Sequence, residues 1–246
     1  MLQLFRSLDV ACFKGHLRGV KTLLLLLIAV LTSSARQPEG ALVGIPPRNI
    51  VPMEVKQRAK NAVQVVVDKT IRGDFKAALD SMNPEYIKVA SRPYGGPEKF
   101  KAGLLKQMNT MGKNGVTFMA AITQPADIAF EVDYGFENKL VDGKPVMGAD
   151  GKPVQIAAYR SWMVFVPTVT DFQYLDKELD PAGQLRKFRK WNFEVAIAKK
   201  KNEKWTFING GSINALQLRK LFPFLPKDDK DLKFPPIKVQ ERKKKK

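Results

Sequence analysis

The sequence predicts an α+β fold in which helices come first and antiparallel strands follow. Up to Met111, apolar residues recur every three or four positions, a spacing typical of amphipathic helices. After Gly115 the period changes to two, which is typical of half-buried strands. Helices followed by a run of strands is the order of an α+β domain. The composition, 44% hydrophobic and 27% charged, is that of a globular protein.

The helical half contains three predicted helices and one predicted short strand. Asp74 is a capping residue that can begin the second helix. Pro97 can begin the third, because a proline at the first helical position loses no intrahelical hydrogen bond. The predicted elements are helices over 54–70, 75–82 and 97–111 and a strand over 86–90.

Five segments with a two-residue period follow and predict the strands of one sheet. They are Val116–Thr123, Asp127–Phe136, Ala157–Thr170, Arg186–Lys200 and Lys204–Asn209. Between the second and third, the sequence Asp-Gly-Lys-Pro-Val occurs at 142–146 and again at 150–154. Each Asp-Gly pair is typical of a turn, so this connection is predicted to be a long hairpin loop. The alternative, a calcium loop, lacks further oxygen ligands.

The N-terminus has the pattern of a secretory signal peptide. Nine apolar residues, Leu23–Leu31, follow a basic flank and precede small residues that suit cleavage after Ala35. A helix of nine residues is roughly 14 Å long, about half of what spans a bilayer. Residues 1–35 are therefore interpreted as a signal peptide, with residues 1–19 a possible mis-assigned start before Val20. A buried core helix or an uncleaved anchor is the alternative. The expected location is the periplasm or the exterior.

The remaining chain is divided into three parts by composition. Residues 36–53 are rich in proline and glycine and are interpreted as a linker. Residues 54–223 hold the predicted elements. Residues 224–246 contain nine basic and four acidic side chains and are interpreted as a disordered tail.

The residue types left after cleavage restrict the chemistry. Cys12 and His16 are the single cysteine and histidine of the chain, and both precede the predicted cleavage site. A disulfide, a zinc site on Cys or His ligands, and Cys–His or Ser–His–Asp catalysis are therefore excluded from the mature chain. Cleavage removes four of 42 basic and one of 24 acidic residues, so the net charge falls from +18 to +15. No cofactor or metal is expected.

Three segments carry a resemblance to the nuclear transport factor 2-like superfamily, which includes ketosteroid isomerase-like and SnoaL-like proteins. They are Arg72-Gly73-Asp74-Phe75, the closing strand Lys204–Gly210, and the apolar Leu221-Phe222-Pro223. The resemblance implies a cone-shaped, curved antiparallel sheet packed on three N-terminal helices. It also implies a pocket inside the cone and a homodimer formed through the outer face of the sheet. Because the superfamily contains both enzymes and binding proteins, the fold leaves the function open.

Strand alternation predicts which side chains line that pocket. In the strand after Asp127 the apolar side chains share one face, so its acidic residues are expected to face outward, Glu131 and Asp133 among them. In the strand after Arg186 the same pattern places Lys190, Asn192 and Glu194 outside. No strand carboxylate is then available as the general base that a ketosteroid isomerase-like mechanism needs. The pocket candidates are Tyr134, Tyr159, Arg189 and Trp191, and ordinary core packing of these residues is the alternative.

Three functions follow from these patterns. The preferred hypothesis is an exported, non-catalytic domain that binds a small ligand or a protein partner in the cell envelope. The second is an isomerase, dehydratase or cyclase that uses a tyrosine or a carboxylate whose face is wrongly assigned. The third is attachment to anionic envelope surfaces through the polybasic end, whose residues are Arg242, Lys243, Lys244, Lys245 and Lys246. The basic and aromatic residues of 186–191 also suit nucleic acid, but alternation explains the aromatic ones as core, so nucleic-acid binding is not expected.

Overall fold

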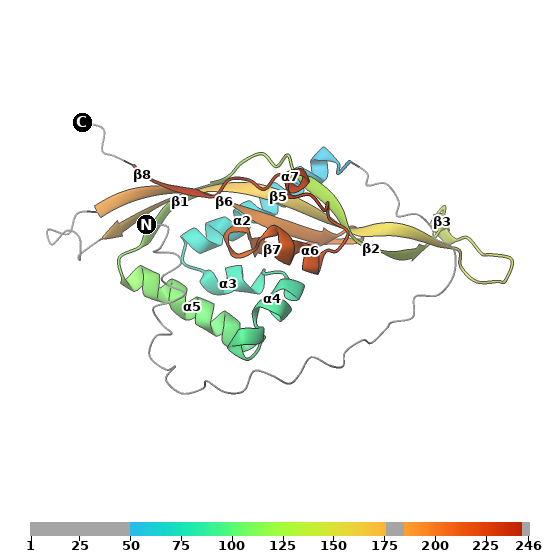
Figure 1. Cartoon of the computed structure of the whole chain (residues 1–246), viewed down its shortest axis with the longest axis horizontal. Helices are drawn as coiled ribbons and strands as arrows, with labels where there is room; N and C mark the ends of the chain where they lie inside the picture. The colour runs from blue at the N-terminus through green and yellow to red at the C-terminus, as the bar shows by residue number, and fades with distance from the viewer. Residues whose placement is uncertain (1–49, 176–184, 243–246) are drawn as a thin grey trace. The chain divides into compact units, whose positions relative to one another are not determined.

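The computed structural model describes residues 50–175 and 185–242. The predicted signal peptide, most of the predicted linker and Lys243–Lys246 lie outside the described residues. The α+β class is confirmed: helices precede a large antiparallel sheet (Figure 1). Among the described helices, none is both long enough and apolar enough to cross a membrane.

Two long antiparallel strands form the centre of the sheet. They are β5 (Gln155–Leu175) and β6 (Leu185–Lys199), paired without a register shift from Ser161 opposite Lys199 to Leu175 opposite Leu185. Each outer edge of this pair carries two shorter strands, one behind the other. On β5 these are β1 (Thr117–Thr123) and β2 (Ala129–Asn138), and on β6 they are β7 (Asn202–Asn209) and β8 (Lys238–Glu241). The sheet is therefore four strands wide along most of its length.

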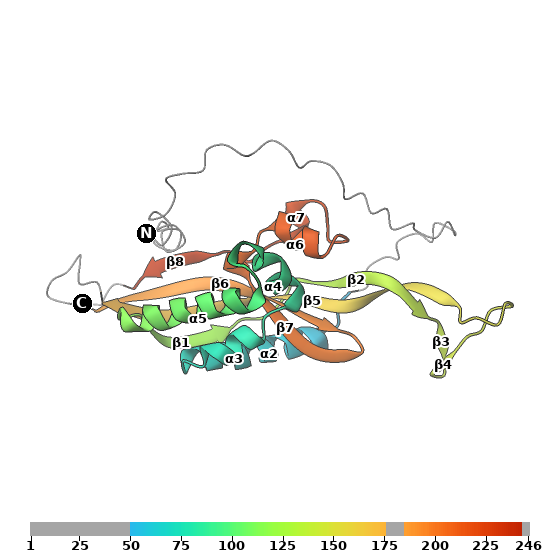
Figure 2. The ribbon, with the colours of Figure 1, turned by 90° about the horizontal axis from the view of Figure 1, so that it is seen from below.

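Helices cover both faces of this sheet. The chain before the sheet forms α2 (Met53–Ile71), α3 (Phe75–Asp80), α4 (Pro84–Ala90), η1 (Arg92–Tyr94) and α5 (Pro97–Lys113). The chain after β7 forms η2 (Gly210–Ser212), α6 (Ala215–Leu221) and α7 (Asp229–Leu232). Figure 2 shows α2 and α3 on one side of the sheet and α6 and α7 on the other. We call these sides the N-terminal face and the C-terminal face.

The centre of the sheet is buried on both faces. On the N-terminal face, Val164 and Val166 pack with Ala59 and Val63 of α2. On the C-terminal face, the core includes Phe165, Phe193, Val195, Leu218 and Leu232. Four consecutive residues of β5, 163–166, are completely inaccessible to solvent, which requires cover on both sides. The expectation of a single apolar face with a polar outer face is therefore wrong at the centre of the sheet.

The second cover comes from a segment for which the sequence predicts a disordered tail. Residues 224–242 are folded instead: Leu225 and Leu232 are buried, and the ring of Phe234 lies 5.2 Å from that of Phe165. Residues 238–241 then pair with β6 as strand β8. Enough apolar side chains are interspersed among the charges to cover the C-terminal face, and their burial outweighs the ordering cost of the segment.

One local prediction is also wrong. Residues 86–90, predicted to be a strand, belong to helix α4. The reason is local: the side chain of Asn83 accepts a hydrogen bond of 3.0 Å from the backbone N–H of Tyr86, and Pro84 occupies the first turn. The other predicted helices and strands are found, with ends shifted by a few residues.

The outer ends of β2 and β5 project from the domain as a two-stranded arm (Figure 1). The arm ends in the predicted loop, where β3 (Leu140–Val141) and β4 (Lys144–Pro145) pair around the first Asp-Gly turn. Asp142 and Gly143 both have positive φ there, 52° and 76°, as an Asp-Gly hairpin turn requires.

Candidate functional site

The four predicted pocket residues lie on one face of the sheet but in two separate places. Tyr134 pairs with Tyr159 across β2 and β5, whereas Trp191 pairs with Val169 across β6 and β5. Val169 lies ten positions after Tyr159 on β5, a distance of about 33 Å at the rise of an extended strand. Both pairs belong to the C-terminal face. Along β5 and β6 their residues lie an even number of positions from Phe165 and Phe193, and such residues share a face of the sheet. They do not line one pocket.

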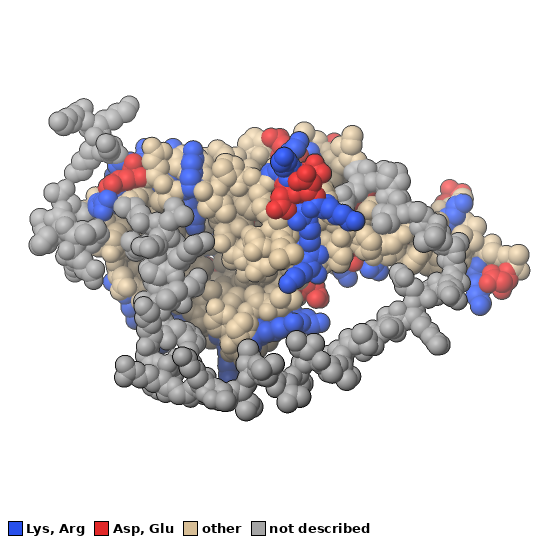
Figure 3. Space-filling view, viewed as in Figure 1, with Lys and Arg blue, Asp and Glu red and all other residues tan. Residues whose placement is uncertain are grey.

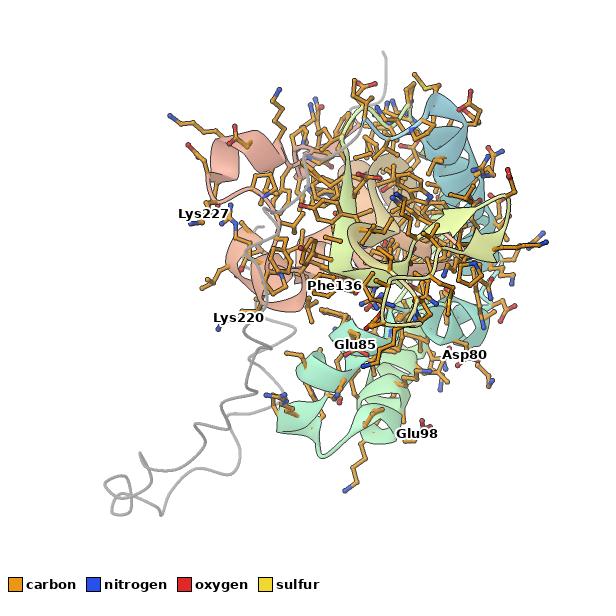
Figure 4. All side chains as sticks on the ribbon, turned by 90° about the vertical axis from the view of Figure 1, so that its right-hand side faces the viewer. Asp80, Glu85, Glu98, Phe136, Lys220 and Lys227 are labelled. Carbon is orange, nitrogen blue, oxygen red and sulfur yellow. The ribbon has the colours of Figure 1, made fainter. Side chains whose placement is uncertain are left out.

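The tyrosine pair is part of an aromatic cluster at the base of the arm. The ring of Tyr134 lies 5.7 Å from that of Tyr159, 4.9 Å from Phe224 and 6.2 Å from Phe136. Tyr159 is 5% exposed and Tyr134 is partly buried, whereas Phe136 is 56% exposed at the arm end of the domain (Figure 4). Both tyrosines therefore pack against neighbouring aromatic rings at the base of the arm.

Arg189 and Trp191 line a shallow surface hollow of about 170 Å³, together with Ile122 and Val169 among others. Arg189 donates two hydrogen bonds, 2.7 and 2.8 Å long, to the carboxylate of Asp171. The bond from Arg189 lowers the pKa of Asp171. Because this guanidinium already has a bidentate partner, the hollow is mainly an apolar depression with an ion pair at its edge.

A cluster of four polar side chains lies on the N-terminal face, and for three of them, Lys190, Asn192 and Glu194, strand alternation predicts exposure to solvent. We call Lys190, Asn192, Glu194 and Asn209 the Glu194 cluster. Glu194 stands directly across from Val166 on β5 and from Asn209 on β7, so it shares the face that α2 covers. Nδ2 of Asn209 donates a hydrogen bond of 2.7 Å to Oε1 of Glu194.

The expectation that Lys190, Asn192 and Glu194 face solvent is therefore wrong. The grouping by alternation is correct, since Trp191, Phe193 and Val195 do share the opposite face. The error is in assuming that only the apolar group could be covered. The carboxylate of Glu194 therefore lies on a helix-covered face of the sheet.

Burial sets the ionisation of this cluster. Burial raises the pKa of Glu194 to about 7, although the hydrogen bond from Asn209 and the charge of Lys190 act in the opposite direction. Burial also lowers the pKa of Lys190, which the charge of Glu194 opposes. Both side chains remain partly accessible to solvent. A carboxyl group that titrates near neutral pH can therefore exchange a proton with water or with a bound molecule.

Asn192 adds an unused hydrogen-bond acceptor. The residue is 7% exposed, and its Oδ1 is buried without a hydrogen-bond partner in the part of the chain that the structure describes. Leaving a buried acceptor unsatisfied costs about 1–3 kcal/mol. Such groups are rare in folded proteins, and one beside a titrating carboxyl group marks a place where a ligand can supply the missing donor.

The backbone around Asn209 is closely packed and holds its side chain in place. Oδ1 of Asn209 accepts a hydrogen bond of 3.0 Å from the N–H of Gly211, while its Nδ2 reaches Glu194. At Gly210 an added Cβ would lie 2.6 Å from ring atoms of Phe193. The sequence signal for this arrangement is Asn209-Gly210-Gly211 at the end of a strand, which sequence analysis did not connect with Glu194.

Glu131, also expected to face outward, is a second buried carboxylate on the N-terminal face. It is 2% exposed and forms an ion pair with Nζ of Lys200. That ammonium also lies 4.3 Å from the ring centre of Trp162, the neighbour of Glu131 across the sheet. Lys200 therefore supports Glu131 from the β6–β7 turn, and the pair is structural.

No protein-family model matches the chain, and no significant match was found among curated proteins or solved structures.

Proposed function

We propose that this protein binds a small polar ligand at the Glu194 cluster, between the N-terminal helices and the sheet. The observation that carries the proposal is Oδ1 of Asn192, which is buried without a hydrogen-bond partner among the described residues and lies on the same strand face as Glu194. Oδ1 of Asn192 and the carboxyl group of Glu194 can both take part in further hydrogen bonds, and core packing alone requires neither group at a buried position. The proposal keeps the sequence-based hypothesis of an exported, non-catalytic domain of the nuclear transport factor 2-like type, and the α+β order with a large antiparallel sheet is compatible with it.

The cluster indicates the chemistry of the ligand. Oδ1 of Asn192 can accept a hydrogen bond, and so can Glu194 when it is ionised. Lys190 is a donor that attracts a carbonyl or carboxylate group. A ligand with neighbouring hydroxyl or amine groups and one such acceptor satisfies the cluster.

Native mass spectrometry of the protein purified from its own host tests this proposal. The wild type is expected to retain a small molecule that Glu194→Gln and Asn192→Leu lose. The matched control is Glu203→Gln, because Glu203 is a carboxylate on the surface, paired with Arg58 at 2.6 Å. Retention of the same molecule by all four proteins would exclude the Glu194 cluster as its site. The same spectra report whether the chain is a monomer or a homodimer.

An acid–base enzyme is the second candidate, and the raised pKa of Glu194 favours it. A catalytic base works best when its pKa lies near the working pH. An isomerase or dehydratase would then show turnover that Glu194→Gln abolishes and that titrates near pH 7 in the wild type. Tyr134→Phe and Tyr159→Phe, on the opposite face, are expected to keep full activity. Turnover unaffected by Glu194→Gln, or absent across a broad panel of carbonyl and hydroxyl substrates, would count against this candidate.

A further inference from the structure

Four strands lie side by side at the end of the sheet that β8 occupies. Across the C-terminal face, Ile122 pairs with Val169, which pairs with Trp191, which pairs with Lys238. The next row contains Asp171, Arg189 and Gln240. Helices α6 and α7 pack on the other half of this face, at Phe165 and Phe193. We call this end the basic platform and define it by Ile122, Lys187, Arg189, Trp191, Lys238 and Arg242.

Strand β8 concentrates positive charge on the platform. The N–H of Arg242 donates a hydrogen bond of 2.8 Å to the carbonyl of Lys187, and its guanidinium lies 3.0 Å from Asp171. The platform thus presents four cations, and Asp171 is the acidic side chain among them, which leaves a net charge of +3. Figure 3 shows basic side chains at this end of the molecule, with acidic ones beside them. Four lysines follow Arg242 directly in the sequence.

Apolar side chains accompany these cations. Ile122 is 57% exposed, and Trp191 is partly exposed with the ammonium of Lys238 4.1 Å above its ring. Beside them, Met119 sits at a register shift of β1 and is also exposed. In the headgroup region of a bilayer, such apolar side chains insert while lysines and arginines reach the phosphates.

We propose that the basic platform binds the surface of a bilayer that contains anionic phospholipids. Four adjacent strands place these cations on one face of the sheet, so that several of them can contact one anionic surface at once. Single-stranded nucleic acid, the other polyanion with this charge requirement, is bound by stacking successive bases on several aromatic rings. The platform offers one ring, and Lys238 already lies against it.

Flotation with lipid vesicles tests the proposal on the protein as purified from its host. Vesicles of phosphatidylcholine mixed with equal parts of phosphatidylglycerol are compared with phosphatidylcholine alone. Binding is expected only with phosphatidylglycerol, and it should decrease strongly between about 50 and about 500 mM salt, because added salt shortens the range of charge interactions. Equal binding to both kinds of vesicle would overturn the proposal.

A matched pair of triple variants separates the platform from net charge. Lys187→Gln, Lys238→Gln and Arg242→Gln together remove three platform cations, and a loss of at least about tenfold in vesicle affinity is expected, since each basic side chain near an anionic surface contributes about fivefold. The control removes Lys139, Lys144 and Lys152 on the arm by the same change and should bind like the wild type. Equal losses in both triple variants would overturn the proposal.

Three further measurements complete the test. Deleting 243–246 is expected to weaken binding only in part, so complete loss with an intact platform would assign binding to the last lysines and overturn the proposal. An oligothymidine that binds more tightly than the vesicles, and loses affinity in the platform variant, would establish nucleic acid as the partner instead. Glu194→Gln should leave vesicle binding unchanged, so failure of the platform and failure of the ligand proposal are distinguishable.

Discussion

Nδ2 of Asn209 donates a 2.7 Å hydrogen bond to Oε1 of Glu194, its direct neighbour across the ladder between β6 and β7. Glu194, which strand alternation assigns to solvent, is thereby held by Asn209 on a helix-covered face. The contact stabilises the ionised carboxylate, whereas burial opposes ionisation more strongly and raises the pKa of Glu194 to about 7. The balance of these two effects makes the stability of the protein depend on pH and leads to the first prediction.

Stability should decrease as pH rises through the range between the ordinary glutamate pKa of 4.5 and the value of about 7 in the folded protein. In this range the unfolded chain has already lost the proton that the folded chain still holds, so each step up in pH favours unfolding. Glu194→Gln removes this titration and should be more stable than the wild type at pH 8, by up to about 3 kcal/mol. Urea unfolding at pH 5 and pH 8 measures the effect, with Glu203→Gln as control. Parallel pH dependence in wild type and Glu194→Gln would contradict the assignment.

Asn192→Leu should stabilise the ligand-free protein. The change replaces a buried acceptor, for which residues 50–175 and 185–242 provide no hydrogen-bond partner, by an apolar side chain of similar size. This should increase the free energy of unfolding by about 1–2 kcal/mol. Thermal unfolding of ligand-free protein measures it. A loss of more than about 1 kcal/mol would instead mean that Asn192 makes a stabilising contact, and it would remove the main support for the ligand proposal.

Gly210→Ala should destabilise the domain, because its Cβ would lie 2.6 Å from the ring of the buried Phe193. Relieving this overlap moves either the ring or the end of β7 and costs about 1–3 kcal/mol. Gly103→Ala in α5 is the matched control: nothing lies within 4 Å of its Cβ, so a gain of about 1 kcal/mol from helix propensity is expected. Equal stability of the two variants would show that the turn after β7 adapts freely.

Leu232→Ala tests whether residues 224–242 belong to the folded domain. Leu232 is completely buried in the core of the C-terminal face, so its truncation should cost about 2–5 kcal/mol. Ile237→Ala, at a half-exposed position in the same segment, should change stability much less. If both variants unfold at the same denaturant concentration as the wild type, this segment contributes nothing to the core.

Lys200→Met should destabilise the protein by about 3 kcal/mol, because it removes the ammonium partner of the buried carboxylate of Glu131. Adding Glu131→Gln to this variant removes the buried charge as well and should recover part of the loss. A double-mutant cycle from chemical denaturation gives the coupling between the two residues. Additive effects would mean that the ion pair does not stabilise the fold.

Local patterns in the sequence determine most of the secondary structure. The three- and four-residue period defines α2 and α5, Asp74 caps α3 through a 3.1 Å hydrogen bond to Ala77 N–H, and strict alternation groups Trp191 with Phe193 and Val195. These features depend on contacts between neighbours in the chain, so the sequence displays them directly. The short segment 86–90 carries no clear period, so its pattern does not identify helix α4. The cap at Asn83, which accepts a hydrogen bond from the N–H of Tyr86, favours the helix there.

Tertiary structure alone decides which strand faces are covered. Alternation separates Glu194 from Phe193 but does not show that α2 lies over one side while the charged C-terminal segment, through Leu225 and Leu232, folds over the other. For the same reason the sequence identifies Tyr134, Tyr159, Arg189 and Trp191 as residues of one face but not their separation along β5. Both decisions depend on contacts between residues distant in the chain, which the pattern of neighbouring residues does not contain.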